Sequence, residues 1–310
     1  MDRFHELKIM LAVVDAGGFA KAASRLNSSP PAVTRAISGL EARLGVEIFA
    51  RTTRSVHLTE AGRVLAERAR AVLADLEAAE KEASGEAAVP TGLLTITASV
   101  TMGRSILPPV ISAFLNAHPR VTARAVLLDR MANLVEEGMD VALRVGQLAD
   151  SSIMARGVGE VRRLLVASPS YIERRGRPRV PADLKLHSVI AFTGLMPNRE
   201  WTYLGEKAQS RLTLQPRFEI NDATAAISCA EAGDGITIAL SYMVAQQIRE
   251  GRLVAILEKH TLPAVPVQIV YPESRLVNPK VRAFVDFAAP RLRSALDDLS
   301  AKSSINRKSR

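Results

Sequence analysis

The sequence predicts an α plus α/β protein, in which a small helical head with a two-stranded wing is joined by a long helix to a larger α/β region. Three observations predict this fold class. Apolar residues recur at helical spacing in three short segments that end by Leu44, and an apolar heptad pattern covers residues 60–86. Beyond residue 91, short apolar strands alternate with helices. That alternation favours mostly parallel sheets.

The head has three predicted helices. Residues 4–16 form the first, because their apolar side chains share one helical face and two glycines follow. A short second helix covers residues 19–26. Ser29 can cap the third helix with its hydroxyl, and Pro30 suits the first helical position, where a missing N–H costs nothing. Gly45 is expected to end this helix.

Residues 52–58 are predicted to form a small hairpin, or wing, and Thr59 is expected to cap the long helix that follows. In residues 60–86, apolar side chains recur at alternating steps of four and three. This seam is long enough to pair with a second copy of the chain. The residues expected in the dimer seam are Leu65, Ala69, Val72, Leu76 and Ala79.

Three short helices, with a glycine turn and a capped third helix, are typical of a helix-turn-helix, whose third helix enters the major groove of DNA. Arginines beside a wing suit a phosphate or a narrow minor groove. A helical bundle with solvated charges has the same periodicity and remains the alternative. The side chains predicted to contact DNA are Ser29, Thr34, Arg35 and Ser38 on the third helix, and Arg51 and Arg54 beside the wing.

The formal net charge of +9 does not by itself identify a nucleic-acid partner. Residues 1–90 contain 12 basic and 12 acidic side chains, so the whole excess lies outside the segment predicted to bind DNA. Within that segment the charges are separated. Residues 21–54 contain six basic and two acidic side chains, whereas the seam helix is acidic. The DNA-binding prediction therefore depends on local pattern.

The α/β region offers a candidate site where its first strand, residues 93–97, meets the next helix. Small and hydroxyl-bearing residues form that turn, and a helix N-terminus can bind an anion. The hydroxyls could equally do no more than cap their own helix. Ligands bind open α/β sheets at the carboxyl ends of strands, so turns after other strands are expected to line the same cleft. The residues expected there are Ser99, Thr101, Met102, Gly146, Thr193 and Asn221.

Arg144, at the end of another predicted strand, has two interpretations. It could bind an acidic effector through its guanidinium group. It could instead form a structural ion pair with Asp140 or Asp150, which are close in the sequence. The sequence leaves both interpretations open.

Several stretches of the chain, in order and without gaps in the head, resemble the LysR-type transcriptional regulator signature. In the head they read GFAKAASRL (residues 18–26), SPPAVTRAI (29–37), LEARLGV (40–46), FARTTR (49–54) and LTEAG (58–62). In the α/β region they are residues 107–109, 118–119, 134–146, 167–171, 221–222 and 279–284. Each stretch alone is weak, but together they are highly specific.

The resemblance implies a bacterial regulator that binds a dyad promoter site in double-stranded DNA. It implies that a small-molecule effector, for which an anion is one candidate, binds between two lobes folded like type 2 periplasmic binding proteins. The chains are expected to form homodimers or homotetramers in the cytoplasm and to act on RNA polymerase. The expected boundaries are 1–59 for the winged helix-turn-helix, 60–90 for the linker helix and hinge, 91–300 for the effector domain (lobes 91–161 plus 267–300, and 162–266), and 301–310 for a basic disordered tail.

The family's DNA contacts carry over to this chain with one departure. Many members have Ser or Gln where this chain has Pro31, and proline cannot donate a hydrogen bond to a base. Readout at that point is expected to be steric, or shifted onto Ser29 and Thr34. The carried-over contacts are Ser29, Pro30, Pro31, Thr34 and Arg35 on the third helix and Arg51 and Arg54 on the wing.

The sequence predicts no catalytic residue, metal ligand or cofactor. Its five histidines lack metal-ligand spacing, and it has no nucleophile elbow, phosphate-binding loop or complete dinucleotide fingerprint. The single cysteine, Cys229, fits a reducing cytoplasm, and neither a membrane span nor a secretory signal is predicted. Two alternatives remain: a DNA-binding regulator that senses no ligand and, less favoured, a two-lobed enzyme with a nucleic-acid-binding head.

Overall fold

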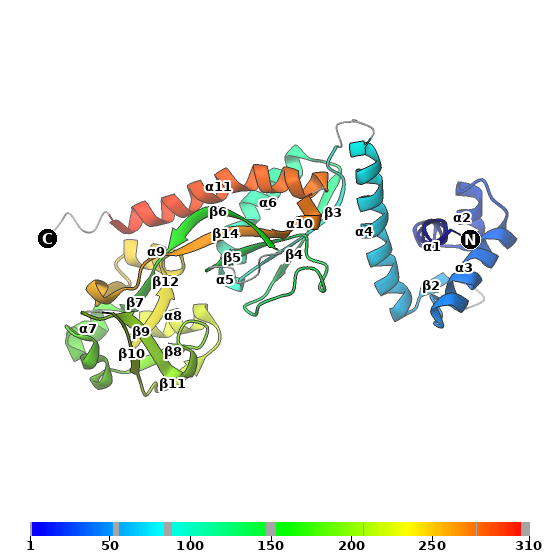
Figure 1. The fold of residues 1–310 in the computed structure, drawn as a ribbon. Coiled ribbons are helices and arrows are strands. Elements are labelled where there is room, and N and C mark those ends of the chain that lie inside the picture. Colours follow the sequence, from blue (N-terminus) through cyan, green and yellow to red (C-terminus); the bar gives the residue numbers. More distant parts are fainter. Residues whose placement is uncertain are drawn as a thin grey trace. The chain divides into compact units, whose positions relative to one another are not determined.

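The computed structural model describes residues 2–51, 56–83, 89–146, 153–206, 208–276 and 278–304. The chain divides into two compact units. Unit 1 comprises residues 1–93 with the short segment 277–280, and unit 2 comprises residues 94–276 and 281–310. Figure 1 labels the helices and strands of both units.

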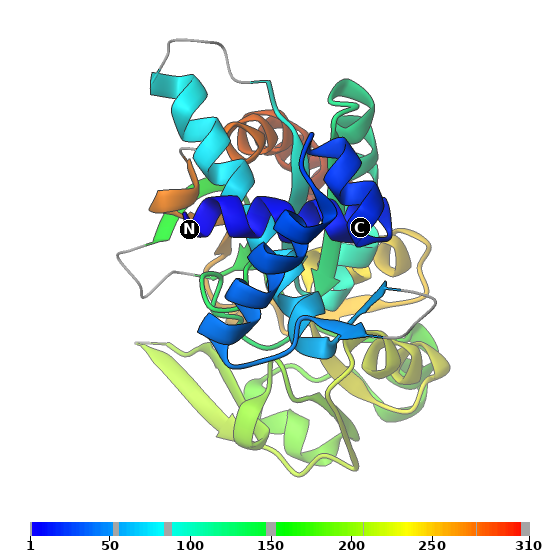
Figure 2. The same cartoon turned by 90° about the vertical axis from the view of Figure 1, so that its right-hand side faces the viewer.

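Unit 1 begins with three helices, which lie toward the viewer in Figure 2. The caps that the sequence predicts for the third helix are present: the Ser29 hydroxyl accepts from the backbone N–H of Ala32, and Gly45 ends the helix with φ of 72°. That left-handed conformation favours glycine, which has no Cβ to clash. The helices are α1 (Arg3–Ala16), α2 (Phe19–Arg25) and α3 (Pro30–Leu44).

The wing and the long helix follow α3. Strands β1 (Phe49–Arg51) and β2 (Val56–Leu58) form an antiparallel pair. Helix α4 (Glu60–Ala83) starts after Thr59, whose hydroxyl accepts from the Gly62 N–H at 3.0 Å and donates to the Glu47 carbonyl at 2.7 Å. The last residues of the predicted linker helix, 84–86, lie outside the described residues.

One apolar core holds unit 1 together, and α4 contributes to it. Ala66 and Ala69, each 2% exposed, join the buried side chains of α1, α2 and α3. An ion pair also connects α1 to α3, because the buried Glu6 accepts from the exposed Arg43 at 2.7 Å. The start of α4 is therefore part of the head and positions the wing against it.

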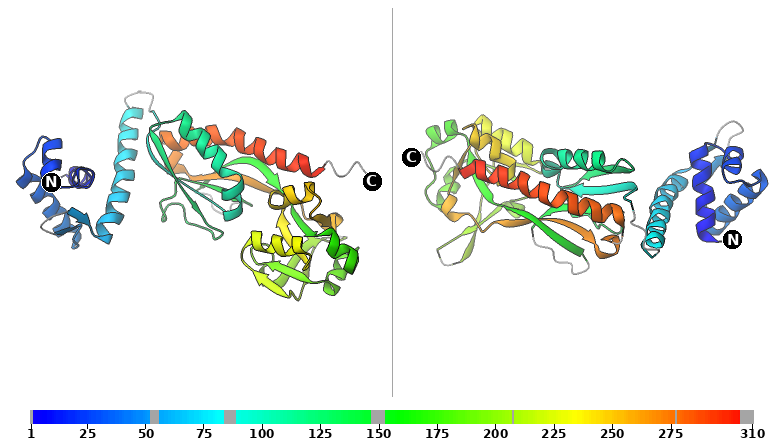
Figure 3. Two further views of the ribbon diagram at one scale, coloured as in Figure 1. Left: turned by 180° about the vertical axis from the view of Figure 1, so that it is seen from behind. Right: turned by 90° about the horizontal axis from the view of Figure 1, so that it is seen from above.

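Unit 2 contains two lobes, each built on a five-stranded sheet. In the first lobe, α6 and α11 cover one face of the sheet, as Figures 1 and 3 show. The strand order is β4-β3-β5-β14-β6. The elements are β3 (Gly92–Ala98), α5 (Val100–Ser105), α6 (Leu107–Ala117), β4 (Val121–Leu127), β5 (Val141–Val145), β6 (Ile153–Val161), β14 (Val265–Pro272), α10 (Glu273–Leu276) and α11 (Pro279–Ser304).

The second lobe has the strand order β11-β8-β12-β7-β13, and a separate hairpin of β9 and β10. Its elements are β7 (Arg163–Ala167), α7 (Pro169–Arg175), η1 (Pro181–Leu186), β8 (Val189–Phe192), η2 (Pro197–Arg199), β9 (Glu200–Leu204), β10 (Gln209–Thr213), β11 (Phe218–Ile220), α8 (Ala223–Ala232), β12 (Ile236–Leu240), α9 (Ser241–Arg249), β13 (Val254–Ile256) and η3 (Glu258–His260).

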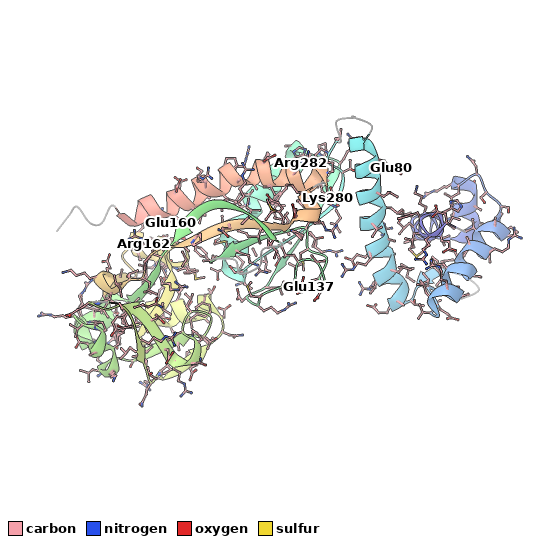
Figure 4. The ribbon with its side chains drawn as sticks, in the orientation of Figure 1. Glu80, Glu137, Glu160, Arg162, Lys280 and Arg282 are labelled. Carbon is pink, nitrogen blue, oxygen red and sulfur yellow. The ribbon has the colours of Figure 1, made fainter. Side chains whose placement is uncertain are left out.

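The two lobes meet where β12 ends and α9 begins. The Ser241 N–H donates to the Arg162 carbonyl at 2.8 Å, and the Arg162 N–H donates to the Ser241 hydroxyl at 3.2 Å. Leu240 and Tyr242 belong to the same apolar cluster as β3, β5 and α6 of the first lobe. Figure 4 labels Arg162 at this junction, where the chain leaves β6.

The sheets are mixed, so the expectation of mostly parallel sheets is wrong. β3 pairs parallel with β5, and β8 pairs parallel with both β11 and β12. β14 is antiparallel to β5 and β6, and β12 and β13 are antiparallel to β7. The chain crosses from one lobe to the other and returns, and β14 re-enters the first sheet in the opposite direction.

Two further differences from the sequence prediction concern β6 and the C-terminal segment. The strand pattern did not predict β6, because most of this strand is exposed and it contains Gly157 and Gly159. A bulge between Val267 and Gln268 shifts its pairing with β14. At the other end, α11 continues to Ser304, so residues 301–304 of the predicted disordered tail are helical. Residues 305–310 lie outside the described residues.

Candidate functional site

The predicted DNA-reading side chains lie along the N-terminal part of α3. Ser29, Pro30, Pro31, Thr34 and Arg35 are all exposed, whereas Ser38 is half-buried. The apolar side of the same helix, which includes Val33, Ile37 and Leu40, is buried in the core of unit 1. Packing therefore fixes which face of α3 is exposed to solvent, and that face contains the DNA-reading residues predicted from the sequence.

Hydrogen bonds within α3 decide what its hydroxyl groups can offer to DNA. The Thr34 hydroxyl donates to the Pro30 carbonyl at 3.0 Å, so its proton is already used and its oxygen can only accept. The Ser29 oxygen accepts from Ala32 N–H at 3.4 Å, which leaves its proton free to donate. Of the two hydroxyls expected to compensate for Pro31, only Ser29 has a free donor.

The structure describes only part of one of the two wing arginines. Arg51 is the last residue of β1, and its backbone pairs with Val56 of β2. The side chain of Arg51 and the whole of Arg54 lie outside the described residues. Their DNA contacts therefore stay a prediction from the sequence.

The predicted dimer seam lies along one face of α4, and the head covers part of it. Ala69 is 2% exposed in the core of unit 1, so its assignment to the seam is corrected, because heptad spacing alone does not show where the head packs on that face. Leu65 is half-buried against the same core. Val72 is 47% exposed, and Leu76 is half-buried. The side chain of Ala79 lies outside the described part of the helix.

The start of α5 does not provide the anion site expected there. Asp129 accepts from the Val100 N–H at 2.9 Å, so a carboxylate of the chain already occupies the helix terminus. Ser99 makes no side-chain cap and Thr101 is half-buried. Met102 is fully buried in the core of the first lobe, so its predicted contact with an effector is wrong.

Arg144 lies half-buried near the end of β5. Its Nη1 donates to the Arg130 carbonyl at 3.3 Å. Burial and the nearby Arg130 lower the pKa of Arg144, while Glu137 raises it. Glu137 itself forms a bidentate ion pair with Arg130. Asp140 instead accepts from the Thr95 N–H and lies 3.7 Å from Arg275, and Asp150 lies outside the described residues.

Three further polar residues of unit 2 were not singled out from the sequence. Thr97 of β3 is fully buried, Gln268 of β14 is half-buried directly opposite Arg144, and Tyr242 of α9 is 6% exposed. Burial raises the pKa of the Tyr242 hydroxyl to about 12, although the neighbouring Ser99 opposes this shift. The available signal was a polar residue inside an apolar strand, as in LLTITA and VPVQIVY.

The second lobe brings Thr193 and Asn221 together. They follow Phe192 and Ile220, which are paired residues of the parallel strands β8 and β11, and both are exposed. The Thr193 N–H donates to the Ile220 carbonyl at 2.9 Å. Gly146 lies in the first lobe instead, where its N–H donates to the Pro266 carbonyl and its φ is 112°. The predicted effector residues therefore form two groups, one in each lobe.

Comparison with protein families identifies both units. A model described as "Bacterial regulatory helix-turn-helix protein, lysR family" matches residues 4–63, and the "LysR substrate binding domain" model matches residues 87–293. The chain belongs to the LysR family of bacterial transcriptional regulators. This confirms the predicted fold class: an N-terminal helix-turn-helix and a C-terminal two-lobed α/β domain. As a LysR-type protein, it is a DNA-binding regulator whose activity is modulated by a small-molecule effector.

Individual relatives support this assignment along nearly the whole chain. The regulator CrgA of Neisseria meningitidis is 31% identical over 93% of this chain and 96% of its own length. A transcriptional repressor of Pseudomonas aeruginosa is 32% identical over 93% of this chain and 91% of its own length. The activator AaeR of Escherichia coli is 30% identical over 92% of this chain and 93% of its own length. These relatives are all named transcriptional regulators.

Solved structures agree with the family. The structure of Neisseria meningitidis CrgA has a TM-score of 0.60 at 31% identity and covers 93% of this chain and 98% of that chain. Full-length AphB, a virulence activator of Vibrio cholerae, has a TM-score of 0.58 at 25% identity. The match covers 92% of this chain and 98% of the AphB chain. A Corynebacterium glutamicum OxyR mutant, at 18% identity and a TM-score of 0.61, shares the fold.

The described residues contain neither a helix that could cross a membrane nor a cluster of metal ligands. No helix in the described ranges combines the length and apolar character needed to cross a membrane. Likewise, within that part of the chain, no three His, Cys, Asp or Glu side chains are grouped so that they could hold a metal ion.

Proposed function

We propose that this LysR-type regulator reads a dyad promoter site with the exposed face of α3, and that an effector bound between the lobes of unit 2 controls it. The observation that carries the proposal is the exposed row from Ser29 to Arg35 at the start of a helix whose opposite side is buried. In a helix-turn-helix, these N-terminal residues meet base edges in the major groove. Arg51 and Arg54 of the wing contact the flanking phosphates or the minor groove.

Two chains pair through α4. The exposed Val72 continues toward Leu76 and Ala79 on one face of that helix, and this face supplies the apolar contact. Pairing there sets two α3 helices against two half-sites of a dyad. Contacts between effector domains join dimers into a tetramer, which acts on RNA polymerase in the cytoplasm. The protein is a regulator and not an enzyme, as its relatives are named.

The effector lies between Ser99 and Arg144 of the first lobe and Thr193 and Asn221 of the second. It can change the relative population of two lobe arrangements only as far as it binds one better than the other. A regulator that binds DNA without sensing any ligand is the second candidate. Footprinting of the purified protein, with and without candidate metabolites, separates the two. Absence of a protected dyad site contradicts the main proposal, and a site indifferent to every ligand favours the second.

A substitution in α3 tests base readout. Arg35→Ala is expected to weaken binding to the protected site by about 1–3 kcal/mol and to leave binding to random DNA nearly unchanged. Ser29→Ala should lose specificity as well, since Ser29 is the hydroxyl with a free donor. Lys8→Ala on α1 serves as a control for loss of positive charge alone. An equal loss on specific and random DNA would show that Arg35 contacts only phosphate.

A further inference from the structure

Unit 2 contains five buried polar atoms that have no hydrogen-bond partner within the described part of the chain. They are Thr97 Oγ1, Ser99 Oγ, Arg144 Nη2, Tyr242 OH and Gln268 Oε1. Ser99 and Tyr242 are neighbours, close enough for Ser99 to lower the Tyr242 pKa, but their hydroxyls do not meet hydrogen-bond geometry. Each such atom has lost water without gaining a partner, a costly state that native proteins seldom keep without a reason.

Three of these side chains belong to neighbouring strands of the first sheet. Gln268 of β14 is directly opposite Arg144 of β5, and Thr97 of β3 pairs in register with the residue two before Arg144. Side chains alternate between the faces of a sheet. The residues next to them in each strand pack into the apolar cluster under α6 and α11. The three polar side chains therefore share the opposite face, which we call the polar floor.

Two further groups approach the polar floor from outside the sheet. Ser99 follows β3, two residues beyond Thr97. Tyr242 of the second lobe belongs to the apolar cluster of the first lobe, and its hydroxyl lies beside Ser99. Glu137 acts electrostatically on Arg144 and lies in the loop beneath the sheet, away from α11, as Figure 4 shows. The floor thus combines one guanidinium with donors and acceptors of three strands, and Ser99 connects it to Tyr242 of the second lobe.

We propose that the effector is a small monocarboxylate that also carries a hydroxyl or amino group. This deepens the proposed function and depends on it. The carboxylate binds the free Nη2 of Arg144, and the hydroxyl or amino group binds Gln268 and Thr97. A charged donor and a carboxylate form the stronger kind of hydrogen bond. Tyr242 adds a contact from the second lobe, so the bound acid touches both lobes.

The charges around the polar floor favour a single negative charge over a phosphate or a dicarboxylate. Arg144 has one nitrogen already bound to the Arg130 carbonyl, and Glu137 partly offsets its charge. Asp129 holds the N-terminus of α5, so that second source of positive potential is taken. Arg130 and Glu137 neutralise each other as an ion pair, so a dianion would meet one uncompensated guanidinium, that of Arg144, with the Asp129 carboxylate close to Ser99.

Thermal unfolding of the full-length protein tests this inference. The ligands are aliphatic and aromatic monocarboxylates at millimolar concentration, with and without a hydroxyl or amino group at C2, such as propionate and lactate or phenylacetate and mandelate, each beside its amide. We expect at least one hydroxy or amino acid to raise the Tm in proportion to its binding, and its amide to have no effect. Arg144→Gln should weaken its apparent affinity roughly thirtyfold or more.

The matched control is Arg156→Gln in the same lobe. Arg156 pairs with Asp286 of α11, on the helix-covered side of the sheet, and should bind the acid as the wild type does. The inference is overturned if an acid and its amide raise the Tm equally, or if Arg144→Gln binds the acid with unchanged affinity. It is also overturned by a panel without any binder, which would mean that only internal water satisfies the floor. A protected dyad site in the same preparation would still support the proposed function, so the two failures are distinguishable.

Discussion

Two buried threonines show how the same residue type can serve opposite purposes. Thr97 and Thr237 are both fully buried in sheets of unit 2. The Thr237 hydroxyl donates to the Ile190 carbonyl at 2.9 Å, whereas the Thr97 hydroxyl has no protein partner among the described residues. Thr97→Val should therefore raise the free energy of unfolding by about 1 kcal/mol, and Thr237→Val should lower it by about the same amount. Urea unfolding of the ligand-free protein measures both.

Valine is close in shape to threonine and both sites are buried, so the two changes in unfolding free energy differ in sign only because one hydroxyl has a partner and the other does not. A polar group kept at a cost to stability is typical of a functional site. If Thr97→Val destabilises the protein as much as Thr237→Val does, then Thr97 has a structural partner and the polar floor loses one of its members. The same variant should also weaken acid binding, since it removes one hydrogen bond.

His187 links the stability of the second lobe to pH. Its Nδ1 is 3.2 Å from the Tyr171 hydroxyl, which accepts from the Ser188 N–H at 2.9 Å and so has its own proton to donate. Only neutral histidine can accept that proton. Burial lowers the pKa of His187 below its ordinary 6.5, and although Asp183 opposes the shift, Arg175 adds to it.

Because the folded state disfavours the charged imidazole, the contribution of His187 is complete above about pH 6.5 and is lost as the pH falls below it. The free energy of unfolding should drop between about pH 7 and pH 5, and His187→Gln should flatten that part of the profile. Denaturant unfolding at several pH values checks this. A variant with the wild-type slope would show that other groups cause the acid sensitivity.

At the level of elements, two glycines of unit 1 have contrasting surroundings. A Cβ on Gly62, in the first turn of α4, would lie 2.1 Å from the backbone oxygen of Ile48. A Cβ on Gly39 in α3 would meet only Glu6 Oε1, at 3.8 Å. Gly62→Ala should therefore separate the wing from α4 and destabilise the head by several kcal/mol, as overpacking against backbone does. Gly39→Ala should stabilise it by about 1 kcal/mol through helix propensity.

Thermal unfolding followed by circular dichroism measures this pair. Gly62→Ala should also lose DNA binding, since the wing and α3 are held by the same contact. Equal stability of the two alanine variants would mean that the wing can move away from α4 without penalty.

The elements that the sequence predicted best are those defined by local chemistry. The third helix starts at Ser29 and ends at Gly45, because a hydroxyl cap and a left-handed glycine act within a few residues. The α5 terminus was predicted wrongly for the opposite reason: the carboxylate that occupies it comes from Asp129, beyond β4. The polar floor likewise combines Thr97, Arg144 and Gln268, which become neighbours only when β14 returns from the second lobe.

At the level of the whole molecule, DNA binding should depend on pairing of two chains through α4. Val72 is 47% exposed on α4 and belongs to the predicted dimer seam. Val72→Glu should prevent pairing, because a carboxylate would have to be buried in an apolar contact. Each chain would then bind a half-site alone and lose the avidity of the dyad, which is worth roughly a hundredfold or more in affinity.

Sedimentation equilibrium measures the loss of the dimer, and titration of a dyad site against a single half-site measures the loss of avidity. Leu186→Glu is the control, because Leu186 is 84% exposed in the second lobe and carries the same change of charge. Wild-type and control should bind the dyad far more tightly than the half-site, whereas Val72→Glu should bind both alike. A Val72→Glu protein that remains dimeric would place the pairing surface elsewhere, and the spacing of the two α3 helices would then have to be set by unit 2.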